Sequence, residues 1–202
     1  MNLAVAVEAE VSCVEVLELE VTPPRPDFDA EVGEACAAVE TGAVGDTRPA
    51  RELYRRFGMD PTRYRPSSEA LLRRVRRGEG LPRVNSLVDV ANVLSVRFQV
   101  PIGLYDVGKV EGDTLTLRIG APGEGYAGIR KEHINVAGRL CVADAAGPCG
   151  NPTSDSERTM ITTGTEAAFW IYFLPVGEAA LEHTAELIAI YGRGLVRVPE
   201  VR

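Results

Sequence analysis

The sequence has few of the residues on which metal sites and nucleophilic sites are usually built. Only two histidines, His133 and His183, occur in 202 residues, and they lie in unrelated segments. The four cysteines are far apart and form no Cys-x-x-Cys pair, which is typical of reduced and mostly buried thiols. We therefore expect no metal site, no disulfide framework and no other cofactor. Any catalysis must rely on carboxylates, backbone groups and positioned water.

Long apolar runs are also missing. No run approaches the roughly 18 residues that span a bilayer, and Met1 opens directly on alternating Leu, Val and Glu without a basic region or a cleavage site. We expect a cytoplasmic protein without a membrane partner. A chain of 202 residues can bury a sizeable core. No shift in composition marks a boundary, so we expect a single domain over 1–202, in which 1–65 is an N-terminal extension integral to the fold.

Two glycine-rich segments need an interpretation. The string Gly123–Gly128 satisfies G-x-G-x-x-G, but the segment after it is too short to be the helix that a dinucleotide site requires, so we interpret it as a turn. There is no Walker loop and no G-x-S-x-G elbow. Residues 147–159 combine hydroxyls, one carboxylate and a basic group. They form either an Asx/Ser turn that caps the next element or a ligand-binding loop.

Charge is distributed unevenly, although the formal net charge is only −7. Residues 1–40 hold ten carboxylates and one arginine, whereas residues 48–83 hold eleven arginines and four carboxylates. Such an arginine cluster is typical of phosphate binding, because guanidinium groups match phosphate oxygens and clustered positive charge favours a polyanion. The alternative, which charge alone favours, is that these arginines cover two helices and pair with the acidic N-terminal segment. We expect a contiguous, exposed basic face over 48–83.

Hydropathy periodicity predicts an α+β fold, with helices on one side of mixed or antiparallel sheet. The first 21 residues alternate apolar and polar side chains, as in a strand or a bent hairpin, and a proline-rich linker follows. Ser67 is expected to be an N-cap. Strands are predicted over 114–119, 139–143 and 168–174, and helices over 29–39, 49–58, 67–78, 84–98 and 176–191.

Three polar residues interrupt the otherwise apolar helix predicted over 84–98. Asn85, Asp89 and Asn92 are spaced by four and three residues, which places them on one face. A buried carboxylate persists only when hydrogen bonds or a cation satisfy it. We therefore expect Asp89 to be structural and to be held by an arginine such as Arg83 or Arg118.

Five short segments in a fixed order carry a family resemblance: Leu81–Asn92, Pro101–Asp106, Leu117–Arg118 with Gly123–Glu124, Asp144, and Asp155–Thr165. The first contains the string Pro-Arg-Val-Asn-Ser-Leu-Val-Asp. With them the chain resembles the B3/B4 domain of the phenylalanyl-tRNA synthetase β subunit over about residues 66–175. It resembles more closely the free-standing B3/B4 proteins that carry this domain without a synthetase, which also share the region Tyr64–Ser68.

The resemblance implies a three-layer β/β/α sandwich of the B3/B4 type. In the synthetase, the cleft of this domain hydrolyses tyrosine wrongly attached to the phenylalanine tRNA. This chain has Gly103 and Ile171 where the synthetase motif has a histidine and a glutamate. Tyrosine specificity is therefore not carried over. We expect a cleft that is wider beside Gly103 and more apolar beside Ile171.

The resemblance implies first a tRNA-binding protein that acts in trans as an aminoacyl-tRNA deacylase, with aminoacylated tRNA and not DNA as its partner. The alternatives are a non-catalytic RNA- or partner-binding module, which the acidic pI of about 5.0 favours, and a small-molecule hydrolase or amino-acid sensor with the same pocket. The expected site residues are Glu124 and Asp155 for catalysis, Asn85, Asp89, Asn92, Tyr105, Asn151, Ser154 and Ser156 for the substrate, and Arg73, Arg74, Arg76 and Arg77 for tRNA phosphates.

Overall fold

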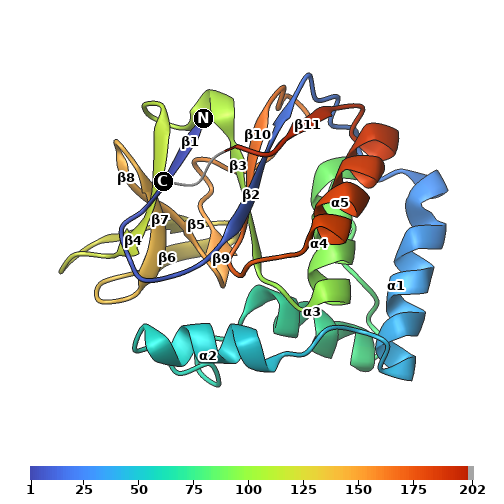
Figure 1. Cartoon of the computed structure of the whole chain (residues 1–202), viewed down its shortest axis with the longest axis horizontal. Coiled ribbons are helices and arrows are strands. Elements are labelled where there is room, and N and C mark those ends of the chain that lie inside the picture. The colour runs from blue at the N-terminus through green and yellow to red at the C-terminus, as the bar shows by residue number, and fades with distance from the viewer. Residues whose placement is uncertain (200–202) are drawn as a thin grey trace.

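The computed structural model describes residues 1–199 and arranges them in three layers (Figure 1). A five-stranded sheet forms one outer layer, a four-stranded sheet lies in the middle, and helices cover the other face of the middle sheet. This is the α+β, three-layer β/β/α architecture that was expected, with the helical layer on one side.

The strands are β1 (Asn2–Val5), β2 (Ser12–Leu17), β3 (Ile102–Asp106), β4 (Thr114–Ile119), β5 (Gly125–Gly128), β6 (Lys131–Asn135), β7 (Leu140–Asp144), β8 (Gly147–Asn151), β9 (Ser154–Asp155), β10 (Ala168–Tyr172) and β11 (Leu195–Arg197). The five-stranded sheet has the order β1-β4-β7-β8-β9, and the four-stranded sheet has the order β11-β2-β10-β3. Strands β5 and β6 form a separate hairpin. Strand β1 is parallel to β4, whereas the other pairs within the sheets are antiparallel, so the sheets are mixed and antiparallel.

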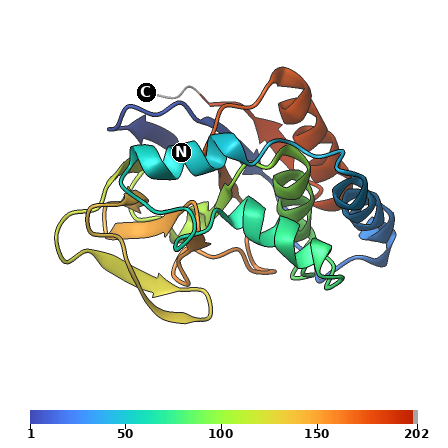
Figure 2. The same cartoon turned by 90° about the horizontal axis from the view of Figure 1, so that it is seen from below.

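The helices are α1 (Asp29–Thr41), α2 (Arg48–Arg56), α3 (Ser67–Arg76), α4 (Ser86–Phe98) and α5 (Glu178–Tyr191), with short 3-10 turns at Pro26–Phe28 and Val107–Lys109. Helix α4 is central, because α1, α3 and α5 all contact it. Helices α2 and α3 run across the lower face of the molecule and are seen from outside in Figure 2. Among residues 1–199, no helix is both long and apolar enough to span a bilayer.

Strand β10 shows how the sequence builds two cores. All five of its residues are buried, and successive side chains of a strand point to opposite faces. Trp170 and Tyr172 therefore face the core between the middle sheet and the helices. Phe169 and Ile171 face the core between the two sheets. Because β10 is apolar on both faces, its sequence shows no alternation of apolar and polar residues, and only its apolar composition identifies it as a strand.

The predicted helices are all present, but the strands are only partly predicted. The alternating first 21 residues are not one hairpin, because β1 pairs with β4 and β2 pairs with β10. The segment predicted to be a glycine-rich turn contains β5, which pairs with β6. The helix after Pro66 begins at Ser67 itself, and no side chain caps it, which corrects the expected N-cap. Tertiary pairing decides these short, glycine-rich strands, and local composition does not reveal it.

Candidate functional site

A cavity of about 360 Å³ lies between α3, α4, β3 and the β8–β9 turn. This volume is within the range of small-molecule sites. Its walls are mainly apolar, and three of its polar residues are consecutive in the chain, at 153–155. The apolar lining includes Leu71, Val88, Ala91, Ile102, Leu104, Met160 and Ile161, and the polar lining includes Ser67, Asn92, Ser95, Thr153, Ser154 and Asp155. The arrangement fits a ligand with one apolar end and one polar end.

Asp155 is the ionisable group that distinguishes this cavity. It lies in β9, where its backbone pairs with Gly150 of β8, and its Oδ2 accepts a hydrogen bond of 3.4 Å from the Leu104 N–H. Burial raises the pKa of Asp155 from its ordinary value of 3.8 to about 7, and the Leu104 N–H opposes this only in part. A carboxyl group that titrates near neutral pH can accept a proton from water and return it.

The turn before Asp155 is held from several directions. The side-chain carbonyl of Asn151 accepts hydrogen bonds from the N–H groups of Thr153 (2.8 Å) and Ser154 (3.0 Å), which is an Asx turn. The hydroxyls of Tyr54 and Thr153 are 2.7 Å apart, and the Tyr126 hydroxyl donates to the Ser154 carbonyl at 2.6 Å. The turn therefore has a fixed shape and presents Thr153 and Ser154 to the cavity. The Asx turn expected within residues 147–159 is present, and ligand binding by this loop stays a prediction.

The three polar residues of α4 have different surroundings. Asn85 caps the helix, since its side chain accepts from the backbone N–H three residues later (2.9 Å). Asp89 is 1% exposed and accepts hydrogen bonds from Arg83 Nε (2.7 Å) and from the Val84 N–H (2.7 Å). The expected pairing of Asp89 with Arg83 is confirmed, and its structural role stays a prediction. Asn92 donates to the Pro82 carbonyl (3.3 Å) and lines the cavity, which Asn85 and Asp89 do not.

Tyr105 lies in the core between the sheets and not at the cavity. Its hydroxyl occupies the space that two glycines leave open: a Cβ on Gly103 would lie 2.7 Å from this oxygen, and a Cβ on Gly150 would lie 2.4 Å from it. Ile171 is paired with Gly103 across β3 and β10 and is fully buried. The expectation of a wider cleft beside Gly103 and Ile171 is wrong, because the phenol ring fills that space and neither residue lines the cavity.

Two more of the expected site residues lie elsewhere. The Glu124 carboxylate accepts hydrogen bonds from both terminal nitrogens of Arg118 (2.6 and 2.7 Å) and from the Ala121 N–H (2.6 Å). The Arg118 hydrogen bonds, with the Ala121 N–H, lower the pKa of Glu124 to about 2. Ser156 is buried, and its hydroxyl accepts from the Arg158 N–H (3.1 Å). Neither Glu124 nor Ser156 lines the cavity, which corrects their expected placement.

The predicted phosphate-binding arginines lie on and just after α3, a helix of the lower face (Figure 2) whose Ser67 and Leu71 line the cavity. Arg73, Arg76 and Arg77 are exposed, and Arg77 donates to Glu79 at 2.7 Å. Arg74 is partly buried, with its Nε 3.0 Å from the carbonyl of residue 80 and its Nη1 3.1 Å from Glu79. The chain thus places three exposed guanidinium groups on one short helix, with one carboxylate next to them.

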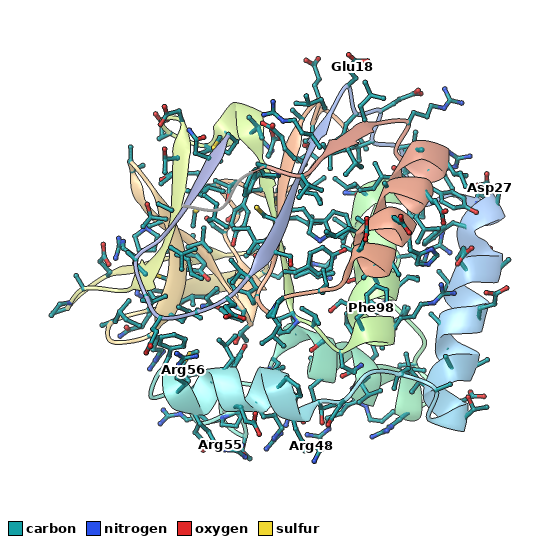
Figure 3. All side chains as sticks on the ribbon, in the orientation of Figure 1. Glu18, Asp27, Arg48, Arg55, Arg56 and Phe98 are labelled. Carbon is teal, nitrogen blue, oxygen red and sulfur yellow. The ribbon has the colours of Figure 1, made fainter. Side chains whose placement is uncertain are left out.

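Helix α2 extends this basic surface. Arg48 and Arg55 point away from the sheets, as Figure 3 shows, and both are exposed. Some arginines of 48–83 do pair with acids: Arg56 lies 3.2 Å from Glu8, and Arg83 pairs with Asp29 of the acidic N-terminal segment. Part of the arginine cluster therefore pairs with acids of the N-terminal segment, ion pairs interrupt the exposed basic face, and phosphate binding stays a prediction.

The cysteines belong to no metal-binding cluster among the described residues. All four cysteines are free, and all but Cys36 are fully buried. Burial raises the pKa values of Cys13, Cys141 and Cys149, so these thiols are protonated at neutral pH. Within residues 1–199, no three His, Cys, Asp or Glu side chains converge in an arrangement that could hold a metal ion.

Comparison with known proteins agrees with this geometry. A model of the B3/4 domain family matches residues 49–186, which is more than half of the chain and includes α3, α4, β3 and the β8–β9 turn. A search of the curated proteins finds no match. Among solved structures, the chain is similar to an N-terminal fragment of the phenylalanyl-tRNA synthetase β subunit from Pyrococcus horikoshii, with a TM-score of 0.55 and 13% identity.

That alignment covers 100% of this chain and 51% of the synthetase fragment, so the chain spans about half of the fragment's length. At this identity the likeness concerns the fold. The family match and the fold agree on one assignment, and the chain belongs to the B3/4 domain family.

Proposed function

We propose that this B3/4 domain binds aminoacylated tRNA and hydrolyses the ester bond between an amino acid and the tRNA. The observation that carries the proposal is the Asp155 carboxyl group, which lies in a largely apolar cavity of about 360 Å³ and has its pKa raised to about 7. Membership of a family with a tRNA-synthetase-related fold supports RNA as the partner. No metal or cofactor is part of the proposal.

In this reaction the amino-acid side chain occupies the apolar part of the cavity, against Val88, Ile102 and Leu104. The ester carbonyl lies at the polar part, beside Thr153 and Asp155. Ionised Asp155 takes a proton from a water molecule as the water oxygen bonds to the carbonyl carbon. The bond from that carbon to the ribose oxygen then breaks, and the proton passes to the ribose oxygen as the free carboxylic acid is released.

The apolar lining also defines the class of amino acid. The one basic residue among the described lining residues, Arg130, is exposed, whereas Val88, Ile102 and Leu104 of the apolar lining are half-buried or buried. Apolar surface rewards an apolar side chain, whereas a hydroxyl buried there without a partner would cost free energy. We therefore expect aliphatic or aromatic aminoacyl groups to be preferred over acidic or basic ones.

The basic surface of α2 and α3 supports binding of the RNA backbone. Its exposed arginines lie on the lower face, next to α3, whose Ser67 and Leu71 line the cavity. Phosphate contacts from arginine position a nucleic acid and make its affinity depend steeply on salt. A steep dependence of affinity on salt concentration therefore distinguishes RNA binding from binding of a neutral small molecule.

A second candidate is an amino-acid-binding module without hydrolytic activity. It is favoured by one observation: Asp155 is the lone carboxylate among the described lining residues, and neither histidine lines the cavity. A single buried carboxylate can hold an ammonium group as well as it can activate water. This candidate includes a small-molecule sensor that does not use tRNA.

One set of measurements separates these functions. Aminoacyl-tRNAs that carry different amino acids are incubated with the protein, with Asp155→Asn and with Glu124→Gln, a control outside the cavity. We expect Asp155→Asn to abolish deacylation and Glu124→Gln to retain it. Titration with tRNA at several salt concentrations and with free amino acids runs in parallel. Binding of tRNA or amino acid without any deacylation would replace the hydrolase with a binding module.

A further inference from the structure

The Tyr105 hydroxyl is a buried polar group that the proposed reaction does not use. Tyr105 lies in β3 and is fully buried in the core between the two sheets. Among the described residues, its hydroxyl has no hydrogen-bond partner. A buried hydroxyl without a partner costs free energy that a phenyl ring in the same place avoids. The oxygen atom therefore needs an explanation.

Two glycines make room for this oxygen atom. A Cβ on Gly103 of β3 would lie 2.7 Å from the hydroxyl oxygen, and a Cβ on Gly150 of β8 would lie 2.4 Å from it. The oxygen is the nearest atom at both positions. Strand β3 belongs to the middle sheet and β8 to the outer sheet. Both sheets thus lack a side chain where the hydroxyl lies.

Gly150 also locates the hydroxyl relative to Asp155. In the antiparallel register of β8 and β9, Gly150 is directly opposite Asp155. Directly opposite residues direct their Cβ atoms to the same face of the sheet, about 5 Å apart. The Cβ position of Gly150 points at the Tyr105 hydroxyl. The Asp155 side chain therefore leaves its strand on the side where this hydroxyl lies.

A contact from β3 places the Asp155 carboxyl group in the same region. The N–H of Leu104, the residue before Tyr105, lies 3.4 Å from Asp155 Oδ2. Burial, and after it the charge of Asp155, raise the pKa of Tyr105 well above its ordinary value of 10. The phenol therefore keeps its proton and can donate it in a hydrogen bond to an ionised carboxylate.

Three further titratable groups act on this phenol: the thiols of Cys141 and Cys149 and the Tyr126 hydroxyl. Burial raises the pKa of Cys141 to about 11 and that of Cys149 to about 12, and it raises the pKa of Tyr126 as well. All three keep their protons at neutral pH. The described lining of the cavity holds one further charged group, Arg130, which keeps its charge. Among these groups, only Asp155 changes its charge near neutral pH.

We propose that Tyr105 is a positioning residue for Asp155, and that its hydroxyl donates a hydrogen bond to the ionised carboxylate. The proposal rests on the function proposed above, in which this carboxylate is the base. The Leu104 N–H and the Tyr105 hydroxyl then hold the carboxylate from the side of β3, and its other lone pairs accept from the water molecule that it activates. Tyr105 does not line the cavity, so it contacts neither the amino acid nor the ester.

The first test is the titration of Asp155 without any substrate. Tyr105→Phe removes the hydroxyl and keeps the ring. The ionised carboxylate then loses a charge-assisted hydrogen bond, so the midpoint of the Asp155 titration should rise by about one pH unit. Nuclear magnetic resonance of the isotope-labelled carboxyl group measures this midpoint.

Tyr172→Phe is the matched control for this titration. The Tyr172 hydroxyl is also buried, but it lies 2.6 Å from the Thr184 hydroxyl, in the core on the other face of the middle sheet. This variant should leave the Asp155 midpoint unchanged. A second measurement uses the wild type and so does not depend on folding of a variant. The resonance of the Tyr105 hydroxyl proton should move downfield with the same midpoint as the Asp155 carboxyl group.

Thermal unfolding separates this role from a merely structural one. At pH 5 Asp155 holds its proton, because its pKa is about 7, and Tyr105→Phe should be at least as stable as the wild type. At pH 9 the variant lacks a hydrogen bond to an ionised group. Relative to the wild type, its Tm should therefore be about 3–5 °C lower at pH 9 than at pH 5. A structural hydroxyl would give the same difference at both pH values.

The proposed reaction provides the last readout. Tyr105→Phe should raise the pH of half-maximal deacylation by about one unit and leave KM unchanged. An Asp155 midpoint that is the same in Tyr105→Phe as in Tyr172→Phe would overturn the proposal, and so would a hydroxyl proton that does not follow the Asp155 titration. Deacylation by the wild type would then still support the proposed function. A shifted midpoint in a protein that hydrolyses no ester would instead refute the deacylase and leave the hydrogen bond in place.

Discussion

Replacing Asp155 by asparagine tests the proposed catalytic group through stability as well as activity. Burial raises the pKa of Asp155 from its ordinary value of 3.8 to about 7, so the folded protein binds this proton more tightly than the unfolded chain does. The resulting stabilisation is fully present below about pH 4 and is lost as the pH rises through about 7. Each pH unit of that interval is worth about 1.4 kcal/mol. Between pH 5 and pH 8 the loss is therefore up to about 3 kcal/mol, and water in the cavity reduces it.

Asparagine has nearly the same shape and no charge to desolvate. Relative to the wild type, Asp155→Asn should therefore gain more stability at pH 8 than at pH 5, by up to about 3 kcal/mol. For a chain of 202 residues this is a difference of about 6–12 °C in the shift of Tm. Thermal unfolding followed by circular dichroism at the two pH values measures it. Glu124→Gln is the matched control: the pKa of Glu124 is about 2, so its effect on Tm should be the same at both.

The same group sets the pH dependence of the proposed reaction. Because ionised Asp155 is the base, deacylation should rise with pH up to about 7 and then level off, after subtraction of spontaneous ester hydrolysis. Equal Tm shifts for Asp155→Asn at pH 5 and pH 8 would show that the carboxyl group titrates normally in the folded protein. The argument for Asp155 as a base would then be refuted, whatever the activity of the variant.

Three further predictions concern other parts of the molecule. Asp89→Ala should lower Tm by about 6–12 °C, because Arg83 and the Val84 N–H lose the buried carboxylate that accepts their hydrogen bonds, at a cost of about 3 kcal/mol. The control Asp27→Ala breaks an exposed ion pair and should leave the melting curve almost unchanged. Gly150→Ala should destabilise the protein, because the added methyl group meets the Tyr105 hydroxyl, and a second change of Tyr105→Phe should restore part of the loss in thermal unfolding. Replacing Arg73 and Arg76 of α3 by glutamine should reduce the salt dependence of tRNA affinity by about two ions in filter-binding titrations, without a change in Tm. An unchanged slope would exclude this helix from the RNA interface.

Local physical rules predict the helices and the partner of Asp89. The helices carry apolar stripes that end at glycine or proline, so nearby residues in the sequence indicate where each helix ends. A carboxylate inside an apolar helix needs a cation, and Arg83, six residues earlier, lies within reach of the first helical turn. Both inferences use only neighbours in sequence, and both agree with the structure.

The direction of side chains in strands depends on register, which the sequence does not contain. In β3, Ile102 and Leu104 line the cavity, whereas Gly103 and Tyr105 face the core between the sheets. Gly103 and Tyr105 stand out in the sequence, the one as an unusual residue at its position and the other as a polar residue, but each lies one position away from a lining residue. A shift of one residue exchanges the two faces of a strand, and only the pairing of β3 with β10 fixes which face is which.

The order β11-β2-β10-β3 of the middle sheet has a consequence for synthesis of the protein. Strand β2 occupies an interior position, yet its partner β10 follows about 150 residues later in the chain. While the ribosome adds the intervening residues, β2 lacks both of its strand partners, β10 and β11. The sheet can therefore close only after β10 has left the exit tunnel, so folding is late and the emerging chain exposes an unpaired, aggregation-prone strand until then.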